Sequence, residues 1–277
     1  MTTRPRKVSR RTQRRAAERG ARECLFCGSV GKLTEQHVYD DWLRGLGYDG
    51  EGLREFIAEP DQPVFQRGGP FTKTLRIVCE DCNGIWLSRM EKAAKPLLLS
   101  MFNTSGQIEL DGDAQLAVAR WAFKIVCVLS QMGRTRTFPL AHCREFRRTS
   151  LPPATSQIWI GAASVRSEPG REQLAESRYE PRAADLSIGE STVRVPLYTA
   201  RFRLLNVVFD VFGHGPAETG LRADLSDDLR RALLPIWPSE HSVIWWPPVT
   251  NLDVIGGVDG LAAAPLVGIP TVIPPRP

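Results

Sequence analysis

Four of the six cysteines form two pairs in which two residues separate the thiols. Cys24 and Cys27 make the first pair, and Cys79 and Cys82 make the second. Each C-x2-C pair can place two thiolates on one metal ion from a tight turn, and two pairs complete a tetrahedral site. Gly28 follows the first pair, where such a turn needs a residue that tolerates positive φ. The spacing predicts a structural zinc ion held by the four cysteines.

The other two cysteines, Cys127 and Cys143, show no metal-binding spacing. Cys127 lies in the apolar helical run 121–129, so we expect it to be a small core residue. Cys143 receives no assignment. The even cysteine count does not indicate disulfides, because no apolar segment of a secretory signal follows the basic N-terminus and cytoplasmic thiols stay reduced. We therefore expect a cytoplasmic protein.

The 51 residues between the two pairs are long for a compact zinc ribbon and imply a folded insert. His37 lies ten residues after Cys27, and Asn83 directly follows Cys82. An imidazole is unprotonated and still basic near pH 7, which suits a general base. His37 also fits a zinc ligand or a buried, hydrogen-bonded histidine, and Asn83 also fits a helix cap.

This arrangement resembles the zinc-knuckle form of the HNH, or ββα-metal, endonuclease family. The resemblance covers residues 23 to about 98, roughly a third of the chain. Trp42-Leu43 and Asn83-Gly-Ile-Trp86 resemble a subset of bacterial and phage members with a long C-terminal extension. The family resemblance implies a metal-dependent endonuclease that hydrolyses DNA phosphodiester bonds, with His37 as the general base and Mg²⁺ or Mn²⁺ as the catalytic ion.

The same resemblance implies ligands for the catalytic ion. Gln36 occupies the position before the base, and Asn83 occupies the first position after the second pair. Glu35 is the nearest carboxylate, but on a strand it points to the opposite face unless a bulge re-aims it. Gln36 stands where the family has an acid or a histidine, and a neutral carbonyl binds a hard divalent ion more weakly than a carboxylate does.

Two further positions depart from the family pattern. No asparagine occurs between His37 and Cys79, where the family has a middle asparagine that orients the base. Leu87 stands one turn after Asn83, where many members carry a histidine ligand, and Glu91 follows a further turn on. These departures favour an alternative: a catalytically degenerate, zinc-stapled nucleic-acid-binding or assembly protein.

The positive charge is concentrated at the N-terminus. Residues 1–22 contain nine Arg or Lys and one Glu, a charge of +8, so the other 255 residues sum to −3. Such an arm suits a polyanion, most simply DNA, and its other interpretation is a solvated tail that aids solubility. The residues we expect to contact nucleic acid are Arg10, Arg11, Arg14, Arg15, Lys73 and Arg76.

Local patterns predict the elements that position these residues. Strands are expected over 72–78, 157–160, 194–201, 202–212 and 242–246. Helices are expected from 83, bending or ending near Lys95 before Pro96, over 114–132, and over 226–234. Residues 44–70, 164–190 and 247–277 are expected to be irregular. On the strand 242–246, one of Trp245 and Trp246 should face inward and the other outward.

Together these elements predict an α+β protein: a treble-clef or ββα zinc-stapled N-terminal module, then helices and a mostly antiparallel sheet domain. The expected segments are a basic disordered arm over 1–22, an HNH-like zinc-knuckle domain over 23–103, a helical segment over 104–150, and an α+β domain over 151–277. The last segment is a candidate surface for a protein partner. No apolar run approaches the ~18 residues of a spanning helix, so no membrane partner is expected.

Overall fold

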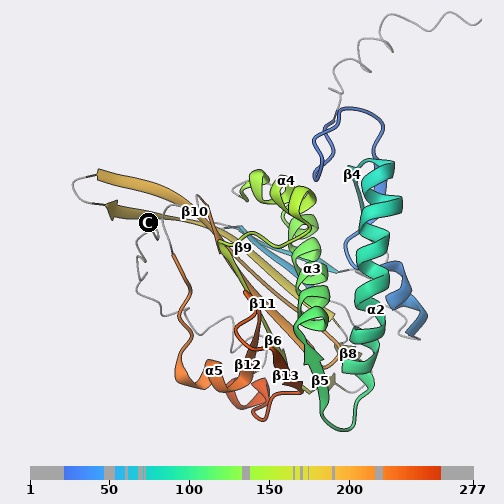
Figure 1. Cartoon of the computed structure of the whole chain (residues 1–277), viewed down its shortest axis with the longest axis vertical. Coiled ribbons are helices and arrows are strands. Elements are labelled where there is room, and N and C mark those ends of the chain that lie inside the picture. Colours follow the sequence, from blue (N-terminus) through green and yellow to red (C-terminus); the bar gives the residue numbers. More distant parts are fainter. Residues whose placement is uncertain are drawn as a thin grey trace, which may run out of the picture.

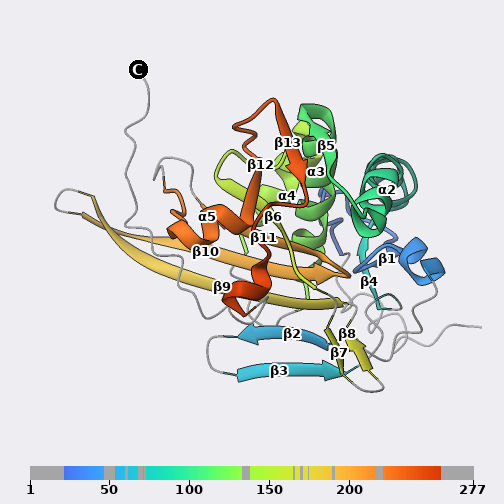
Figure 2. The same cartoon turned by 90° about the horizontal axis from the view of Figure 1, so that it is seen from below.

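The computed structural model describes residues 22–46, 54–59, 62–67, 71, 73–132, 138–164, 166–168, 171–173, 175–188, 191–215 and 221–256. A seven-stranded sheet runs through this part of the chain, and α3, with α2 and α4 beside it, lies on one side of the sheet (Figures 1 and 2). The strands in spatial order are β12 (Leu233–Trp237), β6 (Ser156–Ala162), β11 (Val207–His214), β10 (Ser191–Leu204), β9 (Ala175–Ile188), β2 (Arg54–Glu59) and β3 (Gln62–Arg67).

Neighbouring strands of this sheet are antiparallel, except that β2 runs parallel to β9. The two-stranded pairs join β1 (Thr34–His37) to β4 (Thr74–Val78), β5 (Ile108–Asp111) to β13 (Val243–Trp246), and β7 (Arg166–Glu168) to β8 (Arg171–Gln173). The helices are α2 (Ser88–Asn103), α3 (Gly112–Leu129), α4 (Leu140–Thr149) and α5 (Asp227–Ala232). Within the described residues, the helices of other types include η1 (Asp41–Leu46), a 3-10 helix, and η5 (Leu252–Ile255), a 3-10 helix. They also include η3 (Asp81–Leu87), a π-helix that continues into α2.

Helix α3 is the central helix, and its ends and faces follow from its residues. Asp111 caps the N-terminus, because its side chain accepts a hydrogen bond of 2.8 Å from the backbone N–H of Ala114. All residues from Trp121 to Leu129 are buried, so this half of the helix is enclosed on every side. The predicted helix over 114–132 is confirmed, with ends that differ by two or three residues.

Strand β11 is buried on both faces. Val207, Phe209 and Val211 belong to the main apolar cluster around α3, whereas Val208 and Phe212 belong to a second cluster with α5. Alternate residues of a strand point to opposite faces, so a continuous apolar run is what a doubly covered strand requires.

Strand β13 alternates instead. Trp246 is fully buried and Trp245 is 52 % exposed, which confirms the prediction that one faces inward and the other outward.

The division of residues 194–212 into strands was predicted wrongly. The expected break at 201/202 lies inside β10, and the turn comes later, at Leu205 and Asn206. Leu205 adopts φ +54°, a region that a bulky residue rarely enters. Its side chain is buried in the main cluster, and Asn206 Nδ2 donates to Met101 O over 3.1 Å. Tertiary contacts thus hold a turn that has no local turn sequence.

Two segments expected to be irregular contain strands. Residues 44–70 include β2 and β3, and residues 164–190 include β7, β8 and the whole of β9. The physical reason is backbone pairing between distant segments: β9 pairs with β10 along its whole length, and β2 pairs with β9. Such pairing overrides local composition. The insert expected between the cysteine pairs therefore exists, and it completes one edge of the large sheet.

The helix from Asn83 does not end near Lys95, because α2 continues through Pro96 to Asn103. A proline inside a helix frees the carbonyl four residues earlier, here that of Lys92. Lys92 and Pro96 are both exposed, so water can bind the freed carbonyl oxygen. The solvent-facing position of Pro96 is what allows the helix to persist.

The observed architecture is a mixture of helix and mostly antiparallel sheet, as expected of an α+β protein. Buried apolar contacts are continuous across the expected segment boundaries at residues 103 and 150, since Phe26, Trp121, Phe146 and Trp246 belong to one cluster. The partition into segments stays a prediction. Among the described residues, no helix is long and apolar enough to cross a membrane.

Gly213 offers a test of packing in the sheet. It lies opposite Tyr198, and a Cβ added at Gly213 would come within 2.1 Å of the ring of Tyr198, which is fully buried. We expect Gly213→Ala to lower the free energy of unfolding by about 1–3 kcal/mol, the usual cost of overpacking. Gly106→Ala is the control, because no atom lies within 4 Å of its added Cβ. Equal denaturation midpoints for the two variants would contradict this packing.

The pH dependence of stability tests the buried histidine of α4. His142 bonds to Tyr198 and Thr155, and its burial, aided by the charge of nearby His214, lowers its pKa to about 4 from 6.5. Below pH 6.5 the unfolded chain takes up this proton first. The free energy of unfolding should therefore fall between pH 6.5 and about 4, by at most about 1.4 kcal/mol per pH unit from this group. Urea denaturation at several pH values measures this dependence. The free energy of unfolding of His142→Gln should change less with pH over that range.

Candidate metal centre and adjoining polar cluster

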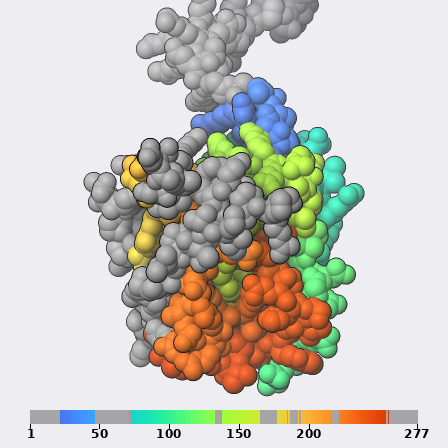
Figure 3. Space-filling view, turned by 60° about the vertical axis from the view of Figure 1, so that its left-hand side comes forward, coloured from blue at the N-terminus to red at the C-terminus, as the bar shows by residue number. Residues whose placement is uncertain are grey.

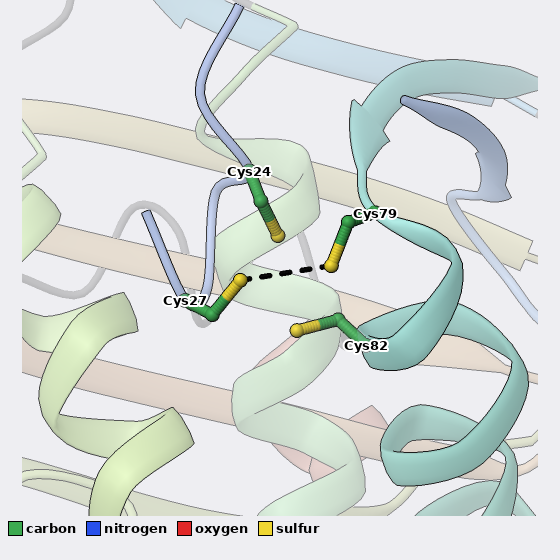
Figure 4. A group of neighbouring side chains, drawn as sticks. All are labelled: Cys24, Cys27, Cys79 and Cys82. Carbon is green, nitrogen blue, oxygen red and sulfur yellow. Dashed lines mark hydrogen bonds between the residues drawn. The ribbon is translucent and has the colours of Figure 1, made fainter. Parts of the chain in front are cut away.

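The four predicted cysteines converge on one point, although a long insert separates the two pairs (Figure 4). All four sulfur atoms lie within 4.8 Å of one another, and Cys27 Sγ lies 3.6 Å from Cys79 Sγ. In a tetrahedral zinc site with Zn–S bonds of about 2.3 Å, neighbouring sulfurs are about 3.8 Å apart. The donors and their spacing therefore fit a metal ion such as zinc.

The first cysteine pair lies in a tight turn that the sequence encodes locally. Gly28 N–H donates to Cys24 O over 3.0 Å, and Cys24 N–H donates to Ser29 O over 2.9 Å. Gly28 adopts φ +79°, which confirms the expectation of a positive φ. Arg144 of α4 donates to Cys24 O, and a Cβ at Gly28 would lie 2.7 Å from its guanidinium. The space-filling view shows this N-terminal segment against α4 (Figure 3).

The second pair joins β4 to the helix that follows it. Cys79 comes directly after β4, and Cys82 lies in the first turn of η3. Asn83 N–H donates to Cys79 O over 3.0 Å, and Leu25 N–H of the first turn donates to Ile77 O of β4 over 2.8 Å. Backbone bonds thus hold the two turns together in the arrangement that brings the thiols into reach of one ion.

The four thiols differ in electrostatic environment. Burial raises the pKa of Cys27, but hydrogen bonds from the side chain and backbone of Ser29 outweigh it and lower the pKa to about 6. Burial raises the pKa of Cys24 and of Cys82. A bound cation would reverse the penalty at the two buried thiols, because it stabilises the thiolate form.

Aromatic side chains pack beside the thiols. Phe26 of the first turn and Phe146 of α4 both contact Trp86 of η3, each with ring centroids 5.1 Å apart. The guanidinium of Arg147 lies over the Trp86 ring at 5.1 Å. Trp86 is therefore a packing residue between the cysteine centre and α4.

Strand β1 carries the three consecutive candidates Glu35, Gln36 and His37. The register with β4 shifts between Thr34 and Glu35, yet Glu35 is exposed and Gln36 is only 3 % exposed. Glu35 accepts a hydrogen bond of 2.8 Å from Arg76, which lowers the pKa of its carboxyl. Glu35 and Gln36 therefore point to opposite faces of β1, and the irregular register does not bring the Glu35 carboxylate to the face of Gln36.

His37 is partly accessible, with a side chain 31 % exposed. Its Nε2 lies 3.9 Å from Asp41 Oδ1, and Asp41 also pairs with Arg44. Its Nδ1 is buried and has no hydrogen-bond partner within the described residues.

Asn83 fastens the helix to β1. Its Nδ2 donates to Thr34 Oγ1 over 3.0 Å and to the carbonyl oxygen of Glu35 over 2.9 Å. The two basic candidates of this region, Lys73 and Arg76, lie just before and within β4, and Arg76 is exposed. The other four basic candidates, Arg10, Arg11, Arg14 and Arg15, fall outside the described residues.

A buried acid–lysine cluster, formed by Asp40, Glu91 and Lys124, was missed in the sequence. Lys124 Nζ bonds to Asp40 and lies 3.0 Å from Glu91 Oε1, and Lys124 is fully buried. Trp42 and Trp121 each donate to Asp40 Oδ2, over 3.0 and 2.7 Å. The available signal was a single lysine inside an apolar helical run, since a lysine is almost never fully buried without a partner.

Opposite charge and burial act against each other in this cluster. Burial penalises the charged form of Lys124, but Asp40 and Glu91 raise its pKa above the usual value. Asp40 keeps a lowered pKa despite its burial, because Lys124 and the two indole N–H groups stabilise the carboxylate. Burial raises the pKa of Glu91. The strongest ion pair of the cluster is therefore Asp40–Lys124, because the pKa values of both groups shift toward their charged forms.

Comparison with known proteins gives no relative for this chain. No family model, no curated protein and no solved structure matches it.

The metal content tests the cysteine centre directly. We expect the isolated protein to contain one zinc ion per chain, measured by inductively coupled plasma mass spectrometry. Cys82→Ser should lose the ion and lower the melting temperature, because the remaining thiols no longer tie β4 to the first turn. Cys127→Ala is the control, since Cys127 is buried outside the cysteine centre. Zinc retained by the Cys82 variant, or lost from the control, would count against this centre.

Proposed function

We propose that this protein is an HNH-like, metal-dependent endonuclease that hydrolyses phosphodiester bonds in DNA. The observation that carries the proposal is the position of His37. It lies on a strand that pairs with β4, and β4 leads through the second cysteine pair into the helix that Asn83 fastens to that strand. Two paired strands and a helix around a four-cysteine centre are what a treble-clef, ββα-type module requires.

His37 has the surroundings that a general base needs. A base must be reachable, and its side chain is 31 % exposed. Nε2 is the nitrogen that can take the proton, because Nδ1 is buried. Asp41 Oδ1, at 3.9 Å from Nε2, can stabilise the protonated imidazole by its charge. In this proposal the carboxylate of Asp41 supports the base in place of the middle asparagine of the family.

The remaining residues bind the ion and the phosphate. A bound Mg²⁺ or Mn²⁺ would polarise the scissile phosphate and stabilise the leaving oxygen. Gln36 and Asn83 are its proposed ligands, whereas Glu35 points to the opposite face of β1 from Gln36. Arg76 is exposed and pairs with Glu35 across β1 and β4, so it can exchange that partner for a phosphate. Lys73 precedes the same strand.

The wider setting follows from charge and thiol chemistry. The Arg-rich arm over residues 1–22 would supply sequence-independent affinity for DNA. A cytoplasmic location would keep the thiols reduced and free for zinc. Residues 151–277 carry no residue of the proposed site, and we assign them to a protein partner or to substrate choice.

A second candidate function, a zinc-stapled nucleic-acid-binding or assembly protein without catalysis, is favoured by one set of contacts. Asn83 Nδ2 is engaged by Thr34 and Glu35, and the Glu35 carboxylate is engaged by Arg76. Asn83 and Glu35, two of the candidate metal ligands, thus already have structural partners, as expected of a catalytically degenerate site.

Plasmid nicking separates the two functions. Purified protein with supercoiled plasmid should nick it with Mg²⁺ or Mn²⁺ and not with EDTA. His37→Ala should lower the rate at least about 100-fold, the usual contribution of a general base. His241→Ala is the matched control, because this histidine is exposed and far along the chain. Absence of metal-dependent nicking, or equal rates for the two variants, would favour the binding protein.

A further inference from the structure

The outer face of the β5–β13 pair carries a large aromatic side chain that the described part of the chain leaves uncovered. Trp245 is 52 % exposed, and its indole N–H has no acceptor among the described residues. Other tryptophans of the protein use this group: an indole N–H donates a hydrogen bond from Trp42, Trp86, Trp121, Trp237 and Trp246. Trp245 therefore offers both a ring face and a donor to a ligand.

A carboxylate lies next to this indole. Trp245 is directly opposite Glu109 in the antiparallel register, and both side chains point outward because their neighbours Ile244 and Leu110 are buried. Glu109 forms no ion pair with the described residues. An exposed ring beside an unpaired acid suits a guanidinium, which stacks on the ring and pairs with the carboxylate.

An apolar groove opens beside Trp245. It has a volume of about 360 Å³ and lies where β13 passes β12, the edge strand of the large sheet (Figures 1 and 2). Leu234, Pro247, Pro248 and Val249 line it together with Trp245. Aromatic-lined grooves bind proline-rich segments in the polyproline II conformation. That backbone has no internal hydrogen bonds, so its carbonyl oxygens can accept from an indole N–H.

We propose that this groove binds residues 270–277 of the same chain. The segment reads Pro-Thr-Val-Ile-Pro-Pro-Arg-Pro, and Arg276 is the only charged residue in 260–277. Its prolines fill the apolar groove, and Arg276 stacks on Trp245 and pairs with Glu109. Because proline fixes φ near the polyproline II value, the segment loses little conformational entropy on binding.

The connection is long enough for docking within one molecule. Val249 lines the groove, and Gly256 follows seven residues later, so Gly256 lies at most about 25 Å away from Val249. Pro270 is a further fourteen residues along, and such a length of chain can span about 45 Å. A tethered segment has a high effective concentration at a groove within its reach. This inference does not rest on the proposed endonuclease activity.

The NMR signal of the Trp245 indole N–H tests the docking in full-length, zinc-loaded protein. Trp245→Phe identifies the signal by its loss. Arg276→Glu should shift the signal, because the segment then meets Glu109 with a like charge and leaves the groove. Arg222→Glu is the matched control, since it makes the same charge change at an exposed arginine and should leave the signal in place.

A synthetic peptide of residues 269–277 tests the recognition itself by calorimetry. It should bind the full-length Arg276→Glu protein, whose groove is vacant. The unaltered protein should bind it at least about tenfold more weakly, because its own segment competes. Adding Glu109→Gln or Trp245→Ala to the Arg276→Glu protein should also weaken binding at least about tenfold. Thermal melts establish that these variants fold, and if only one folds, its affinity decides.

Three results would overturn the proposal. The first is an indole signal that Arg276→Glu leaves in place. The second is a peptide that binds the unaltered and Arg276→Glu proteins with equal affinity, or binds neither. The third is a Trp245 signal that moves on dilution of the unaltered protein, which would assign the groove to a second copy of the chain. Plasmid nicking bears on none of these results, so the groove and the endonuclease can fail separately.

Discussion

A fully buried ammonium must have a counter-charge, and Lys124 imposes that requirement at the centre of the molecule. It projects from α3, the helix that packs on the large sheet, and it bonds to Asp40 just after β1 and to Glu91 on α2. Loss of one partner of such a pair costs about 3–5 kcal/mol, because the other charge stays buried. The N-terminal strand, α2 and α3 are therefore bound to one arrangement by electrostatics as well as by packing.

Strand β1 is held from two directions by unrelated forces. On one side, the backbone of β4 and the cysteine centre keep it beside the start of the helix. On the other side, the acid–lysine cluster and the Gln36 amide tie its end to α2 and α3. His37 lies between these attachments, on a short element that neither its length nor its propensity would stabilise alone. A residue placed in this way is well suited to a role that depends on orientation.

The cysteine centre does not stand apart from the rest of the chain. Arg144, Phe146 and Arg147 of α4 contact the first turn or Trp86, so the cysteine centre packs against a helix far beyond the two cysteine pairs in the sequence. The insert between the cysteine pairs supplies β2 and β3 to the edge of the large sheet. Both connections make the geometry of the centre depend on the C-terminal half of the chain.

The sequence by itself determined the features that depend on local chemistry. The thiol spacing, the glycine after the first pair, the long apolar helix and the alternation of Trp245 and Trp246 are encoded within a few residues of one another. Only the tertiary structure decided which distant groups meet. The pairing of β2 with β9, the Leu205 turn and the contact of Glu91 with Gln36 and Lys124 join segments many residues apart. Their energies come from backbone pairing, burial and charge neutralisation across the fold, which no local pattern of residues contains.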